Sequence, residues 1–116
     1  MDPLRVNADR LWNAIMETAQ FGATAAGGIS RLTLSDEDKQ VRDWFVAQCR
    51  DLGCEVWWDE LGSVFARLEG RDSSLDPIAI GSHLDTQPTG GKFDGIAGVL
   101  SGLEVLRTLV ENDYRT

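Results

Sequence analysis

Histidine is almost absent from this chain of 116 residues, which contains only His83. A site built from several imidazoles is therefore excluded within the chain. Basic residues are also scarce, with 11 Lys and Arg against 19 Asp and Glu and a net charge of −8. Nucleic-acid binding needs a basic face, so we expect no nucleic-acid partner.

The chain has no apolar run of transmembrane length, and its first residues resemble a mixed polar helix rather than a signal peptide. We therefore expect no membrane partner and a cytoplasmic location. The two cysteines, Cys49 and Cys54, are five positions apart with no histidine nearby. This spacing fits neither a zinc knuckle nor a redox pair, so buried free thiols in a reducing compartment are expected.

Hydrophobic periodicity and turn residues predict three helices and three strands. The third strand is a short apolar run that we expect to be buried, and the glycine-rich segment 22–28 is expected to be a flexible loop. The expected elements are a helix over 7–20, a helix capped by Ser35 and ended by Gly53, a hairpin of strands 55–59 and 63–69, a strand over 77–80, and a helix after Asp94.

Helical spacing assigns the first helix a buried face, which comprises Leu11, Trp12, Ile15, Met16 and Ala19. The last helix carries three glycines, Gly95, Gly98 and Gly102, and each weakens a helix by roughly 1 kcal/mol relative to alanine. Their presence indicates a helix that packs closely against a sheet or another backbone. The order of elements predicts an α/β fold with a mixed sheet.

The most informative residues follow the third expected strand. His83 and Asp85 are two positions apart, so an extended backbone directs both side chains to the same side. Asp94 follows the glycines at 90–91 and precedes the last helix. Divalent metals bind imidazole and carboxylate ligands, and a ligating imidazole commonly has a carboxylate behind it.

The same residues also suit a simpler interpretation. A single histidine at a strand end can be a hydrogen-bonded surface residue, and an aspartate before a helix can be its cap. The glycines between Asp85 and Asp94 favour the metal interpretation, because a backbone without side chains can pass close to an ion.

Residues 81–95, from Gly-Ser-His-Leu-Asp to Lys-Phe-Asp-Gly, resemble the first metal-binding motif of the N-carbamoyl-L-amino acid hydrolases. That family is grouped with β-ureidopropionases and allantoate amidohydrolases among the metal-dependent amidohydrolases and peptidases. Residues 28–32, 35–38 and 98–105 resemble it too, so the resemblance covers nearly the whole chain.

The resemblance implies a site with two divalent ions, which could be zinc, manganese, cobalt or nickel. It makes His83 a terminal metal ligand, Asp94 the carboxylate that bridges the ions, and Asp85 a catalytic acid that orients the imidazole. It also implies a cis peptide bond between Asp94 and Gly95. The implied fold is a three-layer α/β arrangement with a mixed sheet, of which residues 1–116 would be the incomplete amino-terminal part, without a dimerisation domain.

The implied activity is hydrolysis of a small N-carbamoyl-L-amino acid to an amino acid, carbon dioxide and ammonia. The family's general base lies in a Glu-Glu pair, and this chain contains no such pair. We therefore expect the chain alone to be inactive, and exposed apolar surface to cause self-association. Two alternatives stay open: an allantoate amidohydrolase or peptidase of the same group, and a non-catalytic remnant that acts as an interaction module.

Overall fold

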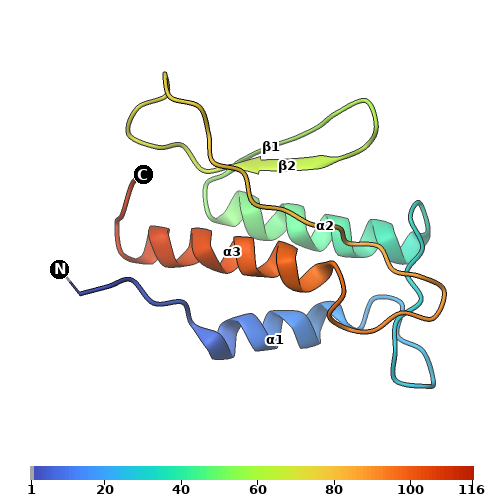
Figure 1. Cartoon of the computed structure of the whole chain (residues 1–116). Helices are drawn as coiled ribbons and strands as arrows, with labels where there is room; N and C mark the ends of the chain where they lie inside the picture. Colours follow the sequence, from blue (N-terminus) through green and yellow to red (C-terminus); the bar gives the residue numbers. More distant parts are fainter. Residues whose placement is uncertain (1) are drawn as a thin grey trace.

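The structure is a computed structural model that describes residues 2–116, and it combines three helices with one hairpin (Figure 1). The α/β class is therefore confirmed. The helix α1 runs antiparallel to α3, and the hairpin lies on the other side of the α2 and α3 layer. The elements are α1 (Ala8–Thr18), α2 (Asp36–Asp51), β1 (Glu55–Trp58), β2 (Val64–Arg67) and α3 (Ile96–Glu111).

The start of α2 confirms the predicted cap. The side chain of Ser35 accepts a hydrogen bond from the backbone N–H of Asp38 at 3.1 Å. The Asp38 carboxylate in turn accepts a bond from the backbone N–H of Leu34, also at 3.1 Å. These reciprocal bonds satisfy backbone donors that a helix start would otherwise leave free, and they fix where α2 begins.

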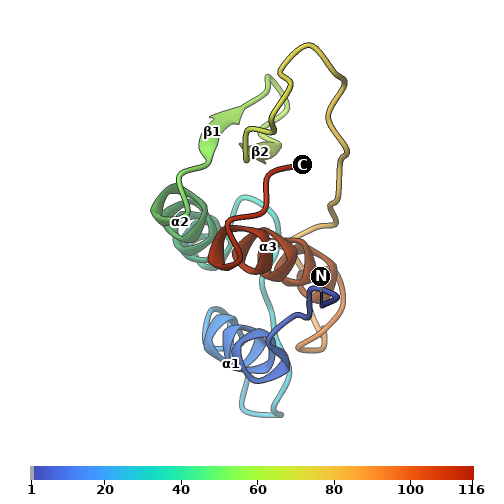
Figure 2. The same cartoon turned by 90° about the vertical axis from the view of Figure 1, so that its left-hand side faces the viewer.

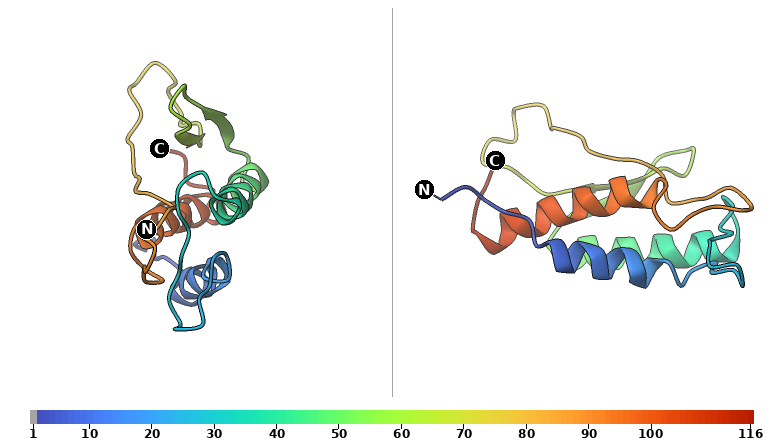
Figure 3. Two further views of the ribbon diagram at one scale, coloured as in Figure 1. Left: turned by 90° about the vertical axis from the view of Figure 1, so that its right-hand side faces the viewer. Right: turned by 60° about the horizontal axis from the view of Figure 1, so that its bottom comes forward.

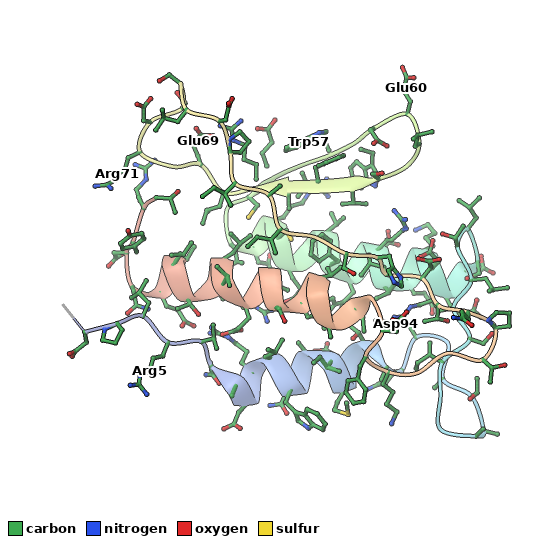
Figure 4. The ribbon with its side chains drawn as sticks, viewed as in Figure 1. Arg5, Trp57, Glu60, Glu69, Arg71 and Asp94 are labelled. Carbon is green, nitrogen blue, oxygen red and sulfur yellow. The ribbon has the colours of Figure 1, made fainter. Side chains whose placement is uncertain are left out.

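The hairpin has an inner and an outer face. Val56 pairs with Ala66, and both pack against the core on the inner face. Trp57 pairs with Phe65, and their rings stack with centroids 5.4 Å apart on the exposed outer face (Figure 4). The alternation expected for a half-buried strand is thus present.

The core lies between α1, α2 and α3, and its buried members are Ala14, Ile15, Val41, Cys49, Cys54, Leu84, Ile96, Leu100 and Leu103. The predicted burial of both cysteines is confirmed. Trp12 was expected in the core, and this was wrong. Its side chain is 54% exposed and packs against Phe93, with ring centroids 6.0 Å apart.

One partly buried ion pair joins α1 to α3. The Glu104 side chain is fully buried and accepts hydrogen bonds from Arg10 Nε at 2.8 Å and from the backbone N–H of Asn7 at 2.9 Å. The side-chain hydrogen bond from Arg10 has the largest effect on the Glu104 carboxyl, and it lowers the pKa of that group. The charged carboxylate therefore stabilises the packing of the two helices.

The expected strand over 77–80 is wrong. The segment forms no strand, and Ile78 and Ile80 are 92% and 60% exposed. Figures 2 and 3 show it running apart from the hairpin (yellow to orange), so no neighbouring strand supplies hydrogen-bond partners within residues 2–116. The expected mixed sheet is accordingly a two-stranded antiparallel one in the described residues.

The glycine pattern of α3 is explained by the same segment. A Cβ atom on Gly98 would lie 2.9 Å from Cβ of Ser82, and one on Gly102 would lie 3.4 Å from the side chain of Ile80. The predicted close packing of this helix against another backbone is therefore confirmed.

No helix within residues 2–116 is long and apolar enough to cross a membrane.

We predict that Glu104→Gln lowers the free energy of unfolding by about 2 kcal/mol near pH 7, since it removes the charge that Arg10 binds. Because the folded-state pKa is lowered, this stabilisation is present above the ordinary pKa of 4.5 and is lost as the pH falls through the lowered value. Urea unfolding of the wild type and the variant across that range measures both effects.

The matched control is Glu111→Gln, because Glu111 also contacts Arg10 but is 52% exposed. We expect that change to cost less than about 0.5 kcal/mol. If the free energies of unfolding of the wild type and Glu104→Gln differ by the same amount at neutral and at acidic pH, the carboxylate charge does not stabilise the fold.

Candidate metal centre

The candidate site rests on a junction between two glycine-containing segments. The backbone N–H of Ile29 donates to the carbonyl of Gly90 at 2.9 Å, and the N–H of Gly90 donates back to Ile29 at 2.8 Å. A second bridge pairs Ala23 with Ile29. The loop predicted over 22–28 is present, and these hydrogen bonds give its backbone a defined path.

Close backbone approach explains the glycines at this junction. A Cβ atom on Gly28 would lie 2.5 Å from the carbonyl oxygen of Gly90, and one on Gly90 would lie 2.8 Å from Cβ of Thr86. A side chain at Gly28 would push the two segments apart, and one at Gly90 would collide with Thr86 in its own segment. The segment that follows His83 is thus fixed against the amino-terminal half of the chain.

The structure brings His83, Asp85 and Asp94 together around one imidazole ring. The ring Nδ1 lies 2.9 Å from the backbone carbonyl oxygen of Asp85 and 3.3 Å from its Oδ1. On the opposite edge, Nε2 lies 3.4 Å from Oδ2 of Asp94. Asp85 and Asp94 therefore face different nitrogens of the same ring, as the sequence motif predicts.

Hydrogen-bond chemistry assigns the neutral tautomer of His83. The carbonyl oxygen of Asp85 can only accept a hydrogen bond, so Nδ1 carries the proton that it receives. In the neutral ring, Nε2 then presents a lone pair to the carboxylate oxygen of Asp94. Two acceptors that face each other without a proton between them repel, and a cation between them removes the repulsion.

This donor pair fits a divalent ion in type and in spacing. Imidazole nitrogen and carboxylate oxygen are both ligands of zinc-like ions. Two ligands about 2.1 Å from a tetrahedral ion lie about 3.4 Å apart, which matches the separation of Nε2 and Oδ2. Access is open, because the side chains of His83 and Asp94 are 49% and 76% exposed.

The pair is not a complete ligand set. No group of three His, Cys, Asp or Glu side chains that could hold a metal ion occurs among residues 2–116. A structural or catalytic zinc site takes three or four protein ligands. Further ligands would therefore have to approach His83 and Asp94 from outside the described residues.

Asp94 ends the loop at the start of α3 (Figure 4), and the next residue sets its direction. Gly95 has φ +73°, and a Cβ atom there would collide with the imidazole ring and carbonyl oxygen of His83. The expected cis bond between Asp94 and Gly95 is wrong, since residues 2–116 contain no cis peptide bond. The positive φ of glycine makes the sharp turn with a trans bond.

Sequence reasoning missed two residues that shape the site. Arg31 is 1% exposed, and its Nε donates to the backbone carbonyl of Leu84 at 2.9 Å. Thr86 is buried as well and bonds to the backbone of Arg31. The signal available in the sequence was that Arg31 lies in the segment 28–32, which resembles the same family as the motif around His83.

Other reactive groups lie elsewhere. Burial raises the pKa of Cys49 to about 12, so its thiol stays protonated and is not a nucleophile. A hollow of about 360 Å³ lies along α1 beside Trp44 and Arg107, and none of His83, Asp85 and Asp94 lines it. The chemistry of the described residues therefore concentrates at His83.

Comparisons with known proteins show what the whole chain resembles. The chain is 50% identical over 112 residues to an N-carbamoyl-L-amino-acid amidohydrolase of Rhizobium meliloti, covering 97% of the chain. It is 40% identical over 93 residues, 80% of the chain, to an allantoate amidohydrolase of Bacillus subtilis. It matches a crystal structure of a hydantoinase/carbamoylase family amidase from Burkholderia ambifaria with a TM-score of 0.97 and 50% identity over 99% of the chain.

The chain is similar in sequence and in structure to these amidases. No protein-family model matches it. The chain spans only 27% of the length of the Rhizobium amidohydrolase, 23% of the Bacillus amidohydrolase and 28% of the Burkholderia amidase. The predicted resemblance to this family is thus confirmed, and the ligand roles of His83, Asp85 and Asp94 stay predictions.

We predict that Gly95→Ala destabilises the fold more than Gly62→Ala does. Both glycines have positive φ, at +73° and +85°, so each alanine costs about 1 kcal/mol of backbone strain. Only Gly95 is crowded by His83, and that clash adds at least about 1 kcal/mol. Denaturant unfolding of the two variants measures the difference, and equal losses would contradict the close contact between Gly95 and His83.

Proposed function

We propose that this chain is the amino-terminal part of the catalytic domain of a metal-dependent amidohydrolase that cleaves the carbamoyl C–N bond of N-carbamoyl-L-amino acids. The observation that carries the proposal is the convergence of His83 Nε2 and Asp94 Oδ2 at 3.4 Å. It occurs in a chain that shares half of its residues with a carbamoyl amidohydrolase. A dimerisation domain would lie outside residues 1–116.

In this proposal His83 and Asp94 would be the residues of this chain that hold the divalent ions. The backbone carbonyl of Asp85 accepts a hydrogen bond from Nδ1–H of His83, which orients the ring so that Nε2 faces Asp94 and the ion site. When bound, divalent ions such as zinc, manganese, cobalt or nickel supply Lewis acidity for a carbonyl and lower the pKa of water. The exposed edge of His83 would admit a small carbamoyl substrate.

The described residues supply part of what hydrolysis needs. A proton must move between water and the leaving nitrogen, and that requires a general base within hydrogen-bond reach. Apart from Asp85 and Asp94, which the proposal commits to orienting the imidazole and binding metal, no carboxylate is paired with His83 in the described part of the chain. We propose that the base and the remaining ligands come from the longer protein.

Allantoate hydrolysis is the second candidate, because the identity to the Bacillus subtilis allantoate amidohydrolase is 40%. Allantoate also presents carbamoyl nitrogen, so the metal pair would serve either reaction. A panel of N-carbamoyl amino acids and allantoate, tested on the full-length protein, separates the two by their kcat/KM values. The expected self-association of the shorter chain stays a prediction, which light scattering of the purified chain tests.

We predict that the 116-residue chain binds Mn²⁺ or Zn²⁺ weakly and releases no measurable ammonia from N-carbamoyl amino acids. Members of a catalytic unit act together, so losing the base and several ligands removes far more than a proportional share of the rate. Isothermal titration calorimetry measures binding, and an ammonia assay measures turnover.

Two variants and one control make the result specific. His83→Ala and Asp94→Ala should each abolish the bound ion, whereas Asp76→Asn changes an exposed aspartate outside the site and should leave binding unchanged. Metal binding that survives His83→Ala would contradict the proposed ligand. Metal-dependent turnover by the isolated chain, lost in His83→Ala, would show that the described residues already build a complete site.

A further inference from the structure

We propose that Arg31 is a positioning residue that holds Asp85, and through it His83, in the geometry needed for metal binding. The effect on metal binding rests on the proposed function, since Arg31 is assigned to that same site. The effect on the orientation of His83 does not, and it can be tested without metal or substrate.

Arg31 is a guanidinium almost without water contact, and its hydrogen bonds go to backbone carbonyls. Its side chain is 1% exposed. Nε donates to Leu84 at 2.9 Å, and Nη1 donates to Thr18 at 3.0 Å and Phe21 at 2.7 Å. One rigid planar group therefore connects the end of α1 to the residue immediately before Asp85.

The backbone of Arg31 fixes the residue immediately after Asp85. Its N–H donates to Oγ1 of Thr86 at 2.8 Å, and its carbonyl accepts from the N–H of Thr86 at 2.7 Å. Leu84 and Thr86 are thus both held by Arg31. The peptide between them carries the Asp85 carbonyl that accepts from His83 Nδ1, so its orientation follows from these contacts.

Charge supports the same arrangement. Burial lowers the pKa of Arg31, and the carboxylates of Asp38 and Asp85 act in the opposite direction. The guanidinium remains charged at neutral pH, because arginine is not deprotonated in proteins. A buried positive charge therefore attracts the nearby carboxylate of Asp85. The Asp85 carbonyl, held in place, favours the Nδ1–H tautomer of His83, which leaves Nε2 free for an ion.

The only histidine of the chain makes the test direct. In a long-range ¹H–¹⁵N spectrum of labelled protein, a single imidazole reports the neutral tautomer without assignment work. We expect the Nδ1–H form to dominate in the wild type. We expect Arg31→Met, which keeps the length but removes donors and charge, to lose this preference and shift to the Nε2–H form that is usual for a free imidazole.

Two further variants separate positioning from folding. Arg31→Lys keeps the charge but lacks the planar fork, so the preference should be partly restored. The control Arg10→Met removes the ion pair with the buried Glu104 and destabilises the fold, yet it lies outside this network and should keep the Nδ1–H form. If Arg31→Met does not fold by circular dichroism, Arg31→Lys and Thr86→Val decide the question, and both should weaken the preference.

Metal titration forms a separate arm. We expect about a 10-fold weaker Mn²⁺ affinity in Arg31→Lys, as is typical when a group behind a metal ligand is changed. If neither the wild type nor any variant binds metal, the proposed function fails. The tautomer result still decides the role of Arg31 in that case. The inference would be overturned if folded Arg31→Met kept the Nδ1–H preference of the wild type. If Arg31→Met does not fold, the same preference in both Arg31→Lys and Thr86→Val would overturn it.

Discussion

A buried guanidinium connects the two halves of this small protein. Arg31 lies where the first glycine-rich segment meets the segment after His83, and it bonds to carbonyl groups from α1, from the following turn and from Leu84. Burying a charge is costly unless its donors are satisfied, so the surrounding backbone must keep one arrangement. The backbone bridge between Ile29 and Gly90 joins the same two segments a few residues away from Arg31.

The packing of α3 against its neighbours sets the position of that helix, and with it the position of Asp94. The ion pair of Arg10 with Glu104 holds α3 against α1, and the glycine row lets residues 80–83 lie directly on the helix surface. His83 is thereby pressed against Gly95, one residue beyond Asp94. The distance between the imidazole and the Asp94 carboxylate is therefore a product of helix packing as much as of the loop that joins them.

Much of this was available from sequence, because it depends on local chemistry. The Ser35 cap, the hairpin around Gly62 and the apolar stripe of α3 follow from side-chain preferences and periodicity. The spacing of His83 and Asp85 likewise predicted that both side chains leave the backbone on the same side, and the family resemblance implied that Asp94 belongs to the same site. The family resemblance rested on those same residues, and the match to amidases confirms it.

What sequence reasoning missed depends on partners far along the chain. The apolar run at 77–80 has the composition of a strand, but a strand also needs a neighbour to bond with, and none is present within residues 2–116. Arg31 gave no periodic signal, since its role comes from carbonyl groups up to 53 positions away. Trp12 fits a helical stripe, yet its contact with Phe93 places it at the surface beside the site.

The central claim is that His83 and Asp94 form the metal-binding edge of this chain. Addition of substoichiometric Mn²⁺ to ¹⁵N-labelled protein tests it most directly, because a paramagnetic ion broadens the resonances nearest to it. We expect the imidazole signals of His83 and the amide signals of Asp94 and Gly95 to broaden first. Broadening that begins at another acidic stretch, such as residues 36–38, and leaves His83 sharp would contradict it.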